Sequence, residues 1–186
     1  MQTSTTTRPE LRTRWRIDPS HSLVEFAVRH LAVATVKGRL RIASGTIVYD
    51  EGTPEDSSVE VTIDARTVDT QEVHRDADLR SANFLDVDRY PEIAFHSTAV
   101  EPAADDRARI LGVLAMHGVK RAIALDARLT GHGRRSDGGE VIGFEARTTI
   151  NRKEFGLAWN AVLETGGLVV GDEIKIEIDV EAVRDA

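Results

Sequence analysis

The stretch EIKIEIDVEA, residues 173–182, shows the most regular alternation of apolar and charged residues in the chain. Every second position is apolar and the positions between carry charge, the apolar set being Ile174, Ile176, Ile178 and Val180. Because successive side chains of a strand point to opposite faces, the pattern predicts a strand with one apolar and one solvent-facing side. The apolar side faces either a filled core or the wall of a cavity.

The same period-two pattern recurs along most of the chain. Polar turns rich in Gly, Pro, Asp and Ser separate the alternating segments, as in antiparallel sheets. The predicted strands, besides one near the start of the chain, are 22–30, 36–42, 46–50, 59–65, 92–98, 109–118, 122–130 and 142–150. We therefore expect an all-β domain, built as a sandwich or a barrel.

One segment, TQEVHRDADLRS at 70–81, lacks the alternation and predicts a helix. We expect Asp69 or Thr70 to cap its N-terminus, since short polar side chains accept hydrogen bonds from the first free N–H groups. Asp76 stands four residues before Arg80, in the order that favours an ion pair on a helix. The segment predicts a short helical insertion near 70–85.

Length and composition restrict the class of protein. The 186 residues fit a single domain, and the absence of cysteine excludes disulfide support. The net charge of −7 repels phosphates, so we expect no nucleic acid partner. The first fourteen residues, MQTSTTTRPELRTR, contain no apolar stretch of a secretory signal, and no segment reaches the roughly 18 apolar residues of a membrane helix. We expect a cytoplasmic protein without stable membrane insertion, with residues 1–13 disordered.

Alternation alone leaves the sandwich and the barrel both open, but two features favour the barrel. Each predicted strand carries charge on one face only, as a closed sheet requires. The apolar faces hold mostly Val, Ile, Leu and Ala, and aromatic residues make up 5% of the chain. A barrel of about eight strands is wide enough either to be filled by side chains or to hold one small ligand.

The order of motifs along the chain resembles that of the YceI-like family of polyisoprenoid-binding bacterial proteins. The resemblance extends from Trp15 almost to the C-terminus. It rests on WRIDPSHSLVEFAVRHL (15–31), VKGRLRIASGTIVYD (36–50), TVDTQEVHRDADLRSANFLDVDRYPEIAFHS (67–97), LGVLAMHGVKRAIAL (111–125), INRKEFGLAWN (150–160) and LVVGDEIKIEIDVEA (168–182).

The resemblance implies an antiparallel, eight-stranded, lipocalin-like β-barrel over residues 14–184, with a long isoprenoid or similar amphiphile in an apolar tunnel. Related barrels also suggest a homodimer, and no other cofactor is implied. Phe84, Phe155, Leu157 and Trp159 lie in irregular segments and are expected at the mouth or cap of the tunnel. The residues expected on the wall are Val24, Phe26, Val28, Leu40, Ile42, Val61, Ile63, Phe95, Leu114, Ile123, Leu125, Phe144, Ile174, Ile176 and Ile178.

The insertion departs from the family pattern at two positions. The family motif often reads Arg-Asp-x-His-Leu, whereas residues 75–79 read RDADL, so Asp78 replaces the usual His. Asn83 stands where an Asp is common. An acceptor at position 78 in place of a donor changes what that residue offers to a ligand headgroup. Many members of the family are exported, and we do not extend that location to a chain without the signal.

Three polar residues are candidates for contacts to a ligand headgroup, namely Arg75, Arg152 and Asn160. A structural role is the alternative for each, and Arg75 with Asp76 is then expected to tie the insertion to the barrel. Trp15 and Trp159 are expected mainly to pack.

Two other functions compete with ligand binding. A hydrolase-type enzyme would use His74, Asp76 and Asp78 as an acid/base cluster, although the chain carries no nucleophile elbow, P-loop or dinucleotide fingerprint. A protein-interaction domain would have the same alternation with a filled core and no small ligand. We expect no metal site, because no short ligand spacing connects the six histidines, His21, His30, His74, His96, His117 and His132.

Overall fold

The computed structural model describes residues 12–161 and 169–185. Its elements are β1 (Arg12–Ile17), β2 (Leu23–His30), β3 (Ala34–Asp50), η1 (Pro54–Asp56), β4 (Ser58–Asp69), α1 (Val73–Arg80), β5 (Glu92–Pro102), β6 (Arg107–Met116), β7 (Val119–Arg134), β8 (Glu140–Asn151), η2 (Arg152–Phe155) and β9 (Val170–Arg184). β1 includes Arg12 and Thr13, which the sequence had assigned to the disordered N-terminus. The rest of that prediction, residues 1–11, lies outside the described residues.

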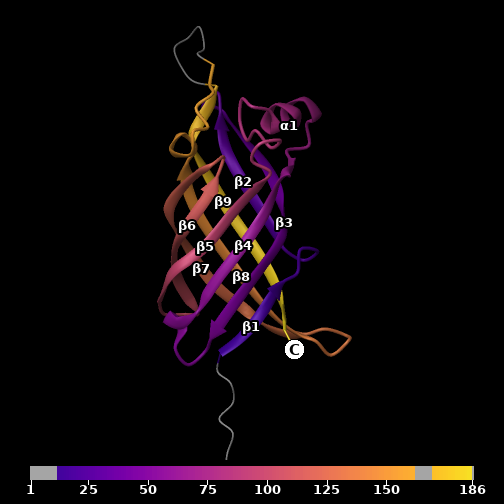
Figure 1. Cartoon of the computed structure of the whole chain (residues 1–186), viewed down its shortest axis with the longest axis vertical. Coiled ribbons are helices and arrows are strands. Elements are labelled where there is room, and N and C mark those ends of the chain that lie inside the picture. Colours follow the sequence, from indigo (N-terminus) through magenta and orange to yellow (C-terminus); the bar gives the residue numbers. More distant parts are fainter. Residues whose placement is uncertain (1–11, 162–168, 186) are drawn as a thin grey trace, which may run out of the picture.

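The strands form one antiparallel sheet that closes on itself (Figure 1). Its order runs β3-β2-β9-β8-β7-β6-β5-β4, and β4 pairs back with β3. β1 pairs with the lower half of β3 and the end of β9, below the place where β2 pairs with the same two strands. β1 and β2 thus share one strand position, and the predicted eight-stranded antiparallel barrel with a short helix is confirmed.

The stretch 173–182 lies within β9, in the middle of this sheet. Ile174, Ile176 and Ile178 pair with Val28, Phe26 and Val24 of β2, so the apolar faces of the two strands coincide. These isoleucines are partly buried and pack against the core, whereas the charged residues between them face outward. The apolar side of the stretch therefore faces the interior of the barrel.

The segments 36–42 and 46–50, predicted as two strands, belong to one strand of 17 residues, β3. Its pairing with β4 shifts register between Ile42 and Ser44, where the chain bends without leaving the sheet. The Ala-Ser-Gly segment at 43–45 is therefore a bend in a long strand and not a turn.

The helix is shorter than predicted and begins later. Glu72 caps it, and its carboxylate accepts hydrogen bonds from the backbone N–H groups of His74 and Arg75. The predicted caps Asp69 and Thr70 are wrong, because Gln71 adopts a left-handed conformation (φ +63°) that separates them from the helix.

The predicted ion pair between Asp76 and Arg80 is also wrong. Asp76 is buried and accepts hydrogen bonds from the N–H and the hydroxyl of Thr70. Arg80 donates instead to the carbonyls of Arg66 and Val68 on β4. Both side chains thus attach the helix to the end of β4, as the structural interpretation of Asp76 expected.

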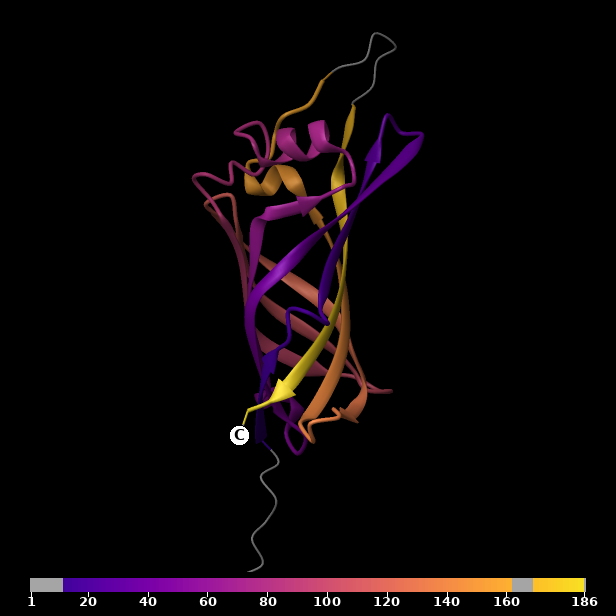
Figure 2. The same cartoon turned by 90° about the vertical axis from the view of Figure 1, so that its right-hand side faces the viewer.

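The two ends of the barrel differ. α1 and η2 lie across the upper end, whereas the lower end carries η1 and the turn between β5 and β6 (Figure 2). Phe155 of η2 is fully buried, and Phe84 and Leu157 are buried as well. The described part of the upper end therefore carries packed apolar side chains.

Candidate ligand-binding site

The barrel encloses two neighbouring cavities. The lower cavity, about 270 Å³ in volume, extends to η1 and to the turn between β5 and β6. The upper cavity, about 160 Å³, extends to Leu79, Phe84 and Leu85 beneath α1. Among the residues that the structure describes, Thr148 and Arg152 are the only polar ones along the upper cavity, so its described wall is almost wholly apolar.

A ring of residues that we call the waist lines both cavities where they meet. Phe95 is the largest member of the waist, and its ring lies against Gly112 of the neighbouring β6. A Cβ atom at Gly112 would collide with this ring and with the backbone carbonyl oxygen of His96, so glycine is needed there. The waist consists of Val24, Val61, Ile63, Phe95, Leu125 and Ile178.

All of the predicted wall residues line one cavity or both, and so do Phe84 and Leu157 from the irregular segments. Phe155 and Trp159 do not. Phe155 packs entirely within the protein, and Trp159 is 39% exposed with its ring 5.2 Å from that of Phe84. Contact with a ligand remains a prediction for all of these residues.

The sequence analysis did not place several residues of the lower cavity on its wall. Val180 continues the alternation of Ile174, Ile176 and Ile178, so the pattern could have identified it. Ile47 and Tyr49 are out of phase with Leu40 and Ile42, because the register of β3 shifts between Ile42 and Ser44. Pro102 ends β5, Ala103 lies in the turn that follows and Arg107 begins β6, and no periodic signal marks such a turn region as part of a lumen wall.

The lower cavity has a polar rim. Ser57 and Ser58 line it from the start of β4, and Asp106 and Arg107 from the turn between β5 and β6. Arg107 lies directly opposite Arg128 across β6 and β7. Both arginines are exposed, so the lower cavity borders solvent at this rim.

Tyr49 and Glu145 at this end each have a shifted pKa. Burial, followed by the charges of Glu51 and Asp106, raises the pKa of Tyr49, which stays a neutral hydrogen-bond donor. The hydrogen bond from Arg128, 2.9 Å long, lowers the pKa of Glu145. Tyr49 and the rim arginines therefore offer donors to a polar group at the lower end.

The upper end contains Arg152, a predicted headgroup contact that is only 2% exposed. Its guanidinium donates to four backbone carbonyls, those of Leu157, Trp159, Val170 and Gly171. Burial lowers its pKa, and the nearby Asp172 carboxylate partly offsets this effect. Arg152 thus joins the segment after η2 to the start of β9.

The two other predicted headgroup contacts also bind the protein itself. Arg75 donates to the hydroxyl and the carbonyl of Thr70, as its structural interpretation expected. Asn160 donates to the carbonyl of Val170 and accepts from its N–H. A role for Arg75, Arg152 or Asn160 in headgroup binding remains a prediction.

The three residues of the enzyme hypothesis do not converge. The His74 side chain is 98% exposed and lies beside Glu72. Asp76 is buried against Thr70, and Asp78 accepts from Asn83 on the far side of the helix end. Among the described residues, no hydrogen bond connects any two of the three, so they form no acid/base relay.

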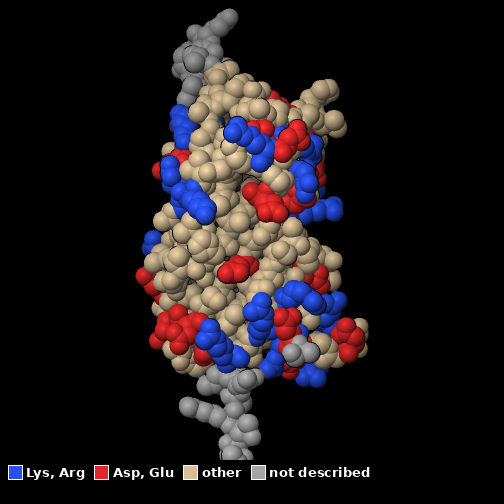
Figure 3. All heavy atoms as spheres, viewed as in Figure 1, with Lys and Arg blue, Asp and Glu red and all other residues tan. Residues whose placement is uncertain are grey.

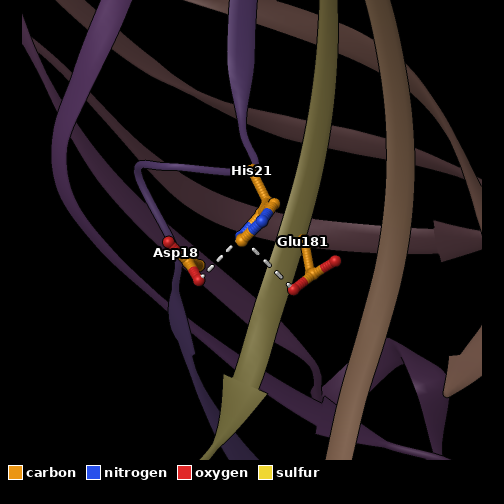
Figure 4. A group of neighbouring side chains, drawn as sticks. All are labelled: Asp18, His21 and Glu181. Carbon is orange, nitrogen blue, oxygen red and sulfur yellow. Dashed lines mark hydrogen bonds and ion pairs between the residues drawn. The ribbon is translucent and has the colours of Figure 1, made fainter. Parts of the chain in front are cut away.

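Outside the barrel, at the break between β1 and β2, three groups able to bind a metal ion come together (Figure 4). One nitrogen of His21 lies between oxygens of Asp18 and Glu181, and the three ligand atoms are within 4.8 Å of one another. The sequence analysis missed this group because Glu181 lies on β9, at the opposite end of the chain, so no short spacing reveals it.

On the face drawn in Figure 3, Lys and Arg alternate with Asp and Glu, and no continuous basic band crosses it. The one α-helix in the described ranges has eight residues, and no helix there is long and apolar enough to cross a membrane.

Comparison with known proteins identifies the family of this chain and finds the same barrel in solved structures. Residues 15–182 match the model of the YceI-like domain. Protein YceI of Salmonella newport (strain SL254) is 35% identical over 181 residues, which cover 96% of this chain and 91% of that protein.

Two solved structures share the fold. Burkholderia cenocepacia BcnA superposes with a TM-score of 0.77 at 19% identity, over 89% of this chain and 98% of that one. A polyisoprenoid binding domain from Saccharophagus degradans, implicated in plant cell wall breakdown, superposes with a TM-score of 0.64 at 13% identity, over 92% and 98%.

Proposed function

The chain belongs to the YceI-like domain family, and on this premise we propose that it binds a long apolar amphiphile in the lumen of its barrel. The ligand class is an isoprenoid, quinone-like or fatty chain, held without chemical conversion for storage, transport or sequestration. The observation that carries the proposal is the pair of apolar cavities inside a closed barrel.

The wall suits a tail that needs little directional recognition. Each methylene group buried in an apolar site contributes about 0.8 kcal/mol, which is an upper limit because ordering the tail costs entropy. The cavities of about 270 and 160 Å³ together fall within the range of about 300–1,000 Å³ typical of small-molecule sites. A tail that crosses the waist would use both cavities.

The polar end of the ligand is proposed to lie at the lower rim, with the tail directed toward α1. At the upper end, Arg75, Arg152 and Asn160 already donate to the backbone, and the buried side chains of Phe84, Phe155 and Leu157 are apolar. At the lower end, Tyr49 and Arg107 line the cavity, and within the described residues neither side chain makes a hydrogen bond. A phosphate, carboxylate or carbonyl would accept hydrogen bonds from both.

The name of one structural relative supports the ligand class. The domain from Saccharophagus degradans is described as polyisoprenoid binding, and its barrel superposes on nearly the whole of this one. The identity of 13% extends only the fold to this chain, so the ligand class stays a proposal.

Titration of the delipidated protein with polyprenols, quinones and fatty acids tests the proposal. Ala146→Phe fills the lower cavity, and Ala124→Phe places the same ring on the outside of β7, where the residue lines neither cavity. We expect Ala146→Phe to weaken binding by at least about tenfold, the loss of two buried methylenes, and Ala124→Phe to bind as the natural chain does. Equal binding by both variants would contradict the site in the lumen, and no binding by the natural chain would favour an interaction domain without a small ligand.

A further inference from the structure

We propose that Asp18, His21 and Glu181 form a binding site for a divalent transition-metal ion such as Zn²⁺, on the outer surface of the barrel at the break between β1 and β2. The site lies apart from the lumen and does not depend on the proposed ligand. Figure 4 shows that Asp18 and His21 come from the loop and Glu181 from β9, and that all three side chains point into one space.

The distances suit a metal ion. His21 Nδ1 lies 3.0 Å from Asp18 Oδ2 and 3.7 Å from Glu181 Oε1. Zinc bonds to nitrogen and oxygen are about 2.0–2.2 Å long, so adjacent ligand atoms in tetrahedral or octahedral geometry lie roughly 3.0–3.5 Å apart. Small rotations of the Glu181 side chain therefore bring the three atoms around one ion.

The backbone holds the site in place without any help from the ion. The N–H of Asp18 donates to the carbonyl of Glu181 at 2.8 Å, and the hydroxyl of Ser22 donates to the same carbonyl at 3.2 Å. The N–H of Glu181 donates back to the Ser22 hydroxyl at 3.1 Å. These bonds fix the loop to β9 on both sides of His21, so little order is lost when an ion binds.

The chemistry of the ligand atoms selects the type of ion. One imidazole and two carboxylates favour borderline ions such as Zn²⁺ or Co²⁺ over Mg²⁺ and Ca²⁺, which prefer oxygen alone. The imidazole must offer Nδ1 without a proton and then keeps its proton on Nε2, which faces away from the ion. Solvent has access to the site, because the His21 side chain is 56% exposed.

Arg135 competes with the ion. Its Nη1 lies 3.2 Å from Asp18 Oδ2, the same oxygen that approaches His21. Its removal leaves two carboxylates and one imidazole with no nearby cation, and the affinity for a divalent ion should rise. A purely structural hydrogen-bond cluster would show no such gain.

The test is calorimetric titration of the full, untagged chain with Zn²⁺, supported by the visible absorption of Co²⁺. We expect one ion per chain, little binding of Mg²⁺, and at least about tenfold weaker binding in His21→Ala and in Glu181→Gln. Arg135→Gln should bind about thirtyfold more tightly, the effect of removing one positive charge ~4 Å from a divalent ion in water.

His74→Ala is the matched control, because His74 lies beside a single carboxylate, Glu72, at 3.2 Å. It should bind Zn²⁺ as the natural chain does. The proposal is overturned if the natural chain shows no saturable binding, if Mg²⁺ binds equally well, or if the loss occurs in His74→Ala and not in His21→Ala. If His21→Ala fails to fold, the other two variants decide. Weaker Zn²⁺ binding in Glu181→Gln together with tighter binding in Arg135→Gln supports the site, and an unchanged affinity in both overturns it.

Discussion

Asn83 donates a hydrogen bond of 2.9 Å from its side-chain amide to Oδ1 of Asp78. The resemblance predicts His and Asp at these two positions, so a single hydrogen bond joins the two departures to each other. Asn83 is the donor and Asp78 the acceptor, and the bond lies at the C-terminal end of α1.

Restoring only one family residue should therefore destabilise the insertion. Asn83→Asp places two carboxylates together, and we expect it to lower the free energy of unfolding by about 0.5–1.5 kcal/mol, the net value of one hydrogen bond. Asp78→His with Asn83→Asp should recover most of that loss. Urea unfolding of the two single variants and the double variant measures the coupling, and strictly additive effects would contradict the pairing.

Arg152 should prove structural. Arg152→Lys cannot reach four carbonyls with a single ammonium group, so at least one buried carbonyl is left without a donor. We expect a loss of at least about 1–3 kcal/mol in the free energy of unfolding, the cost of one such group. Arg128→Lys, at an exposed position, should change stability by less than about 1 kcal/mol. A similar small effect at both positions would contradict the role given to Arg152.

The waist should set the length of chain that the barrel accepts. Ile178→Phe adds bulk at the waist, whereas Phe95→Ala joins the two cavities. With fatty acids of graded length, Ile178→Phe should lose affinity for the longest chains, by about tenfold for every two methylenes no longer buried. Phe95→Ala should shift the preference toward longer chains. An unchanged length profile in both variants would show that the waist does not restrict the tail.

Asp18 should contribute stability that depends on pH. The hydrogen bond to His21 and then that from the Ser20 N–H lower the pKa of Asp18 below 3.8, its value in an unfolded chain. A carboxyl with a lowered pKa stabilises the fold above the unfolded value, and this stabilisation is lost as pH falls through the folded pKa. The difference in unfolding free energy between the natural chain and Asp18→Asn should therefore shrink as pH falls below about 5. Chemical unfolding from pH 7 to pH 3 measures it, and a constant difference would contradict this assignment.

Alternation predicted the barrel well because the rule acts on each strand separately. Ile174, Ile176 and Ile178 point inward for the same reason that Glu177 and Lys175 point outward, so the lumen wall follows from period two. The local rule also overlooked features set by contacts between distant segments. It predicted a cap at Thr70, but the polar groups of Thr70 bind Asp76 and Arg75 instead. It also predicted an ion pair between Asp76 and Arg80, whose actual partners lie in the strand before the helix or directly after it.

The polar sites were beyond sequence reasoning for the same physical reason. Arg152 binds carbonyls of residues up to 19 positions away, and His21 meets Glu181 only because β9 lies beside the loop in the closed sheet. Neither arrangement leaves a spacing that a single sequence displays. The rim of the lower cavity is likewise formed by turns whose meeting depends on closure of the barrel.

Native mass spectrometry of the protein after gentle purification from a bacterial host, followed by organic extraction, tests the central claim most directly. We predict one apolar adduct per chain, absent from Ala146→Phe and present in Ala124→Phe, with an isoprenoid, quinone-like or fatty chain in the extract. A natural chain that carries no adduct, and still takes up none when polyprenols, quinones and fatty acids are added, would contradict the account and leave the barrel with a filled core.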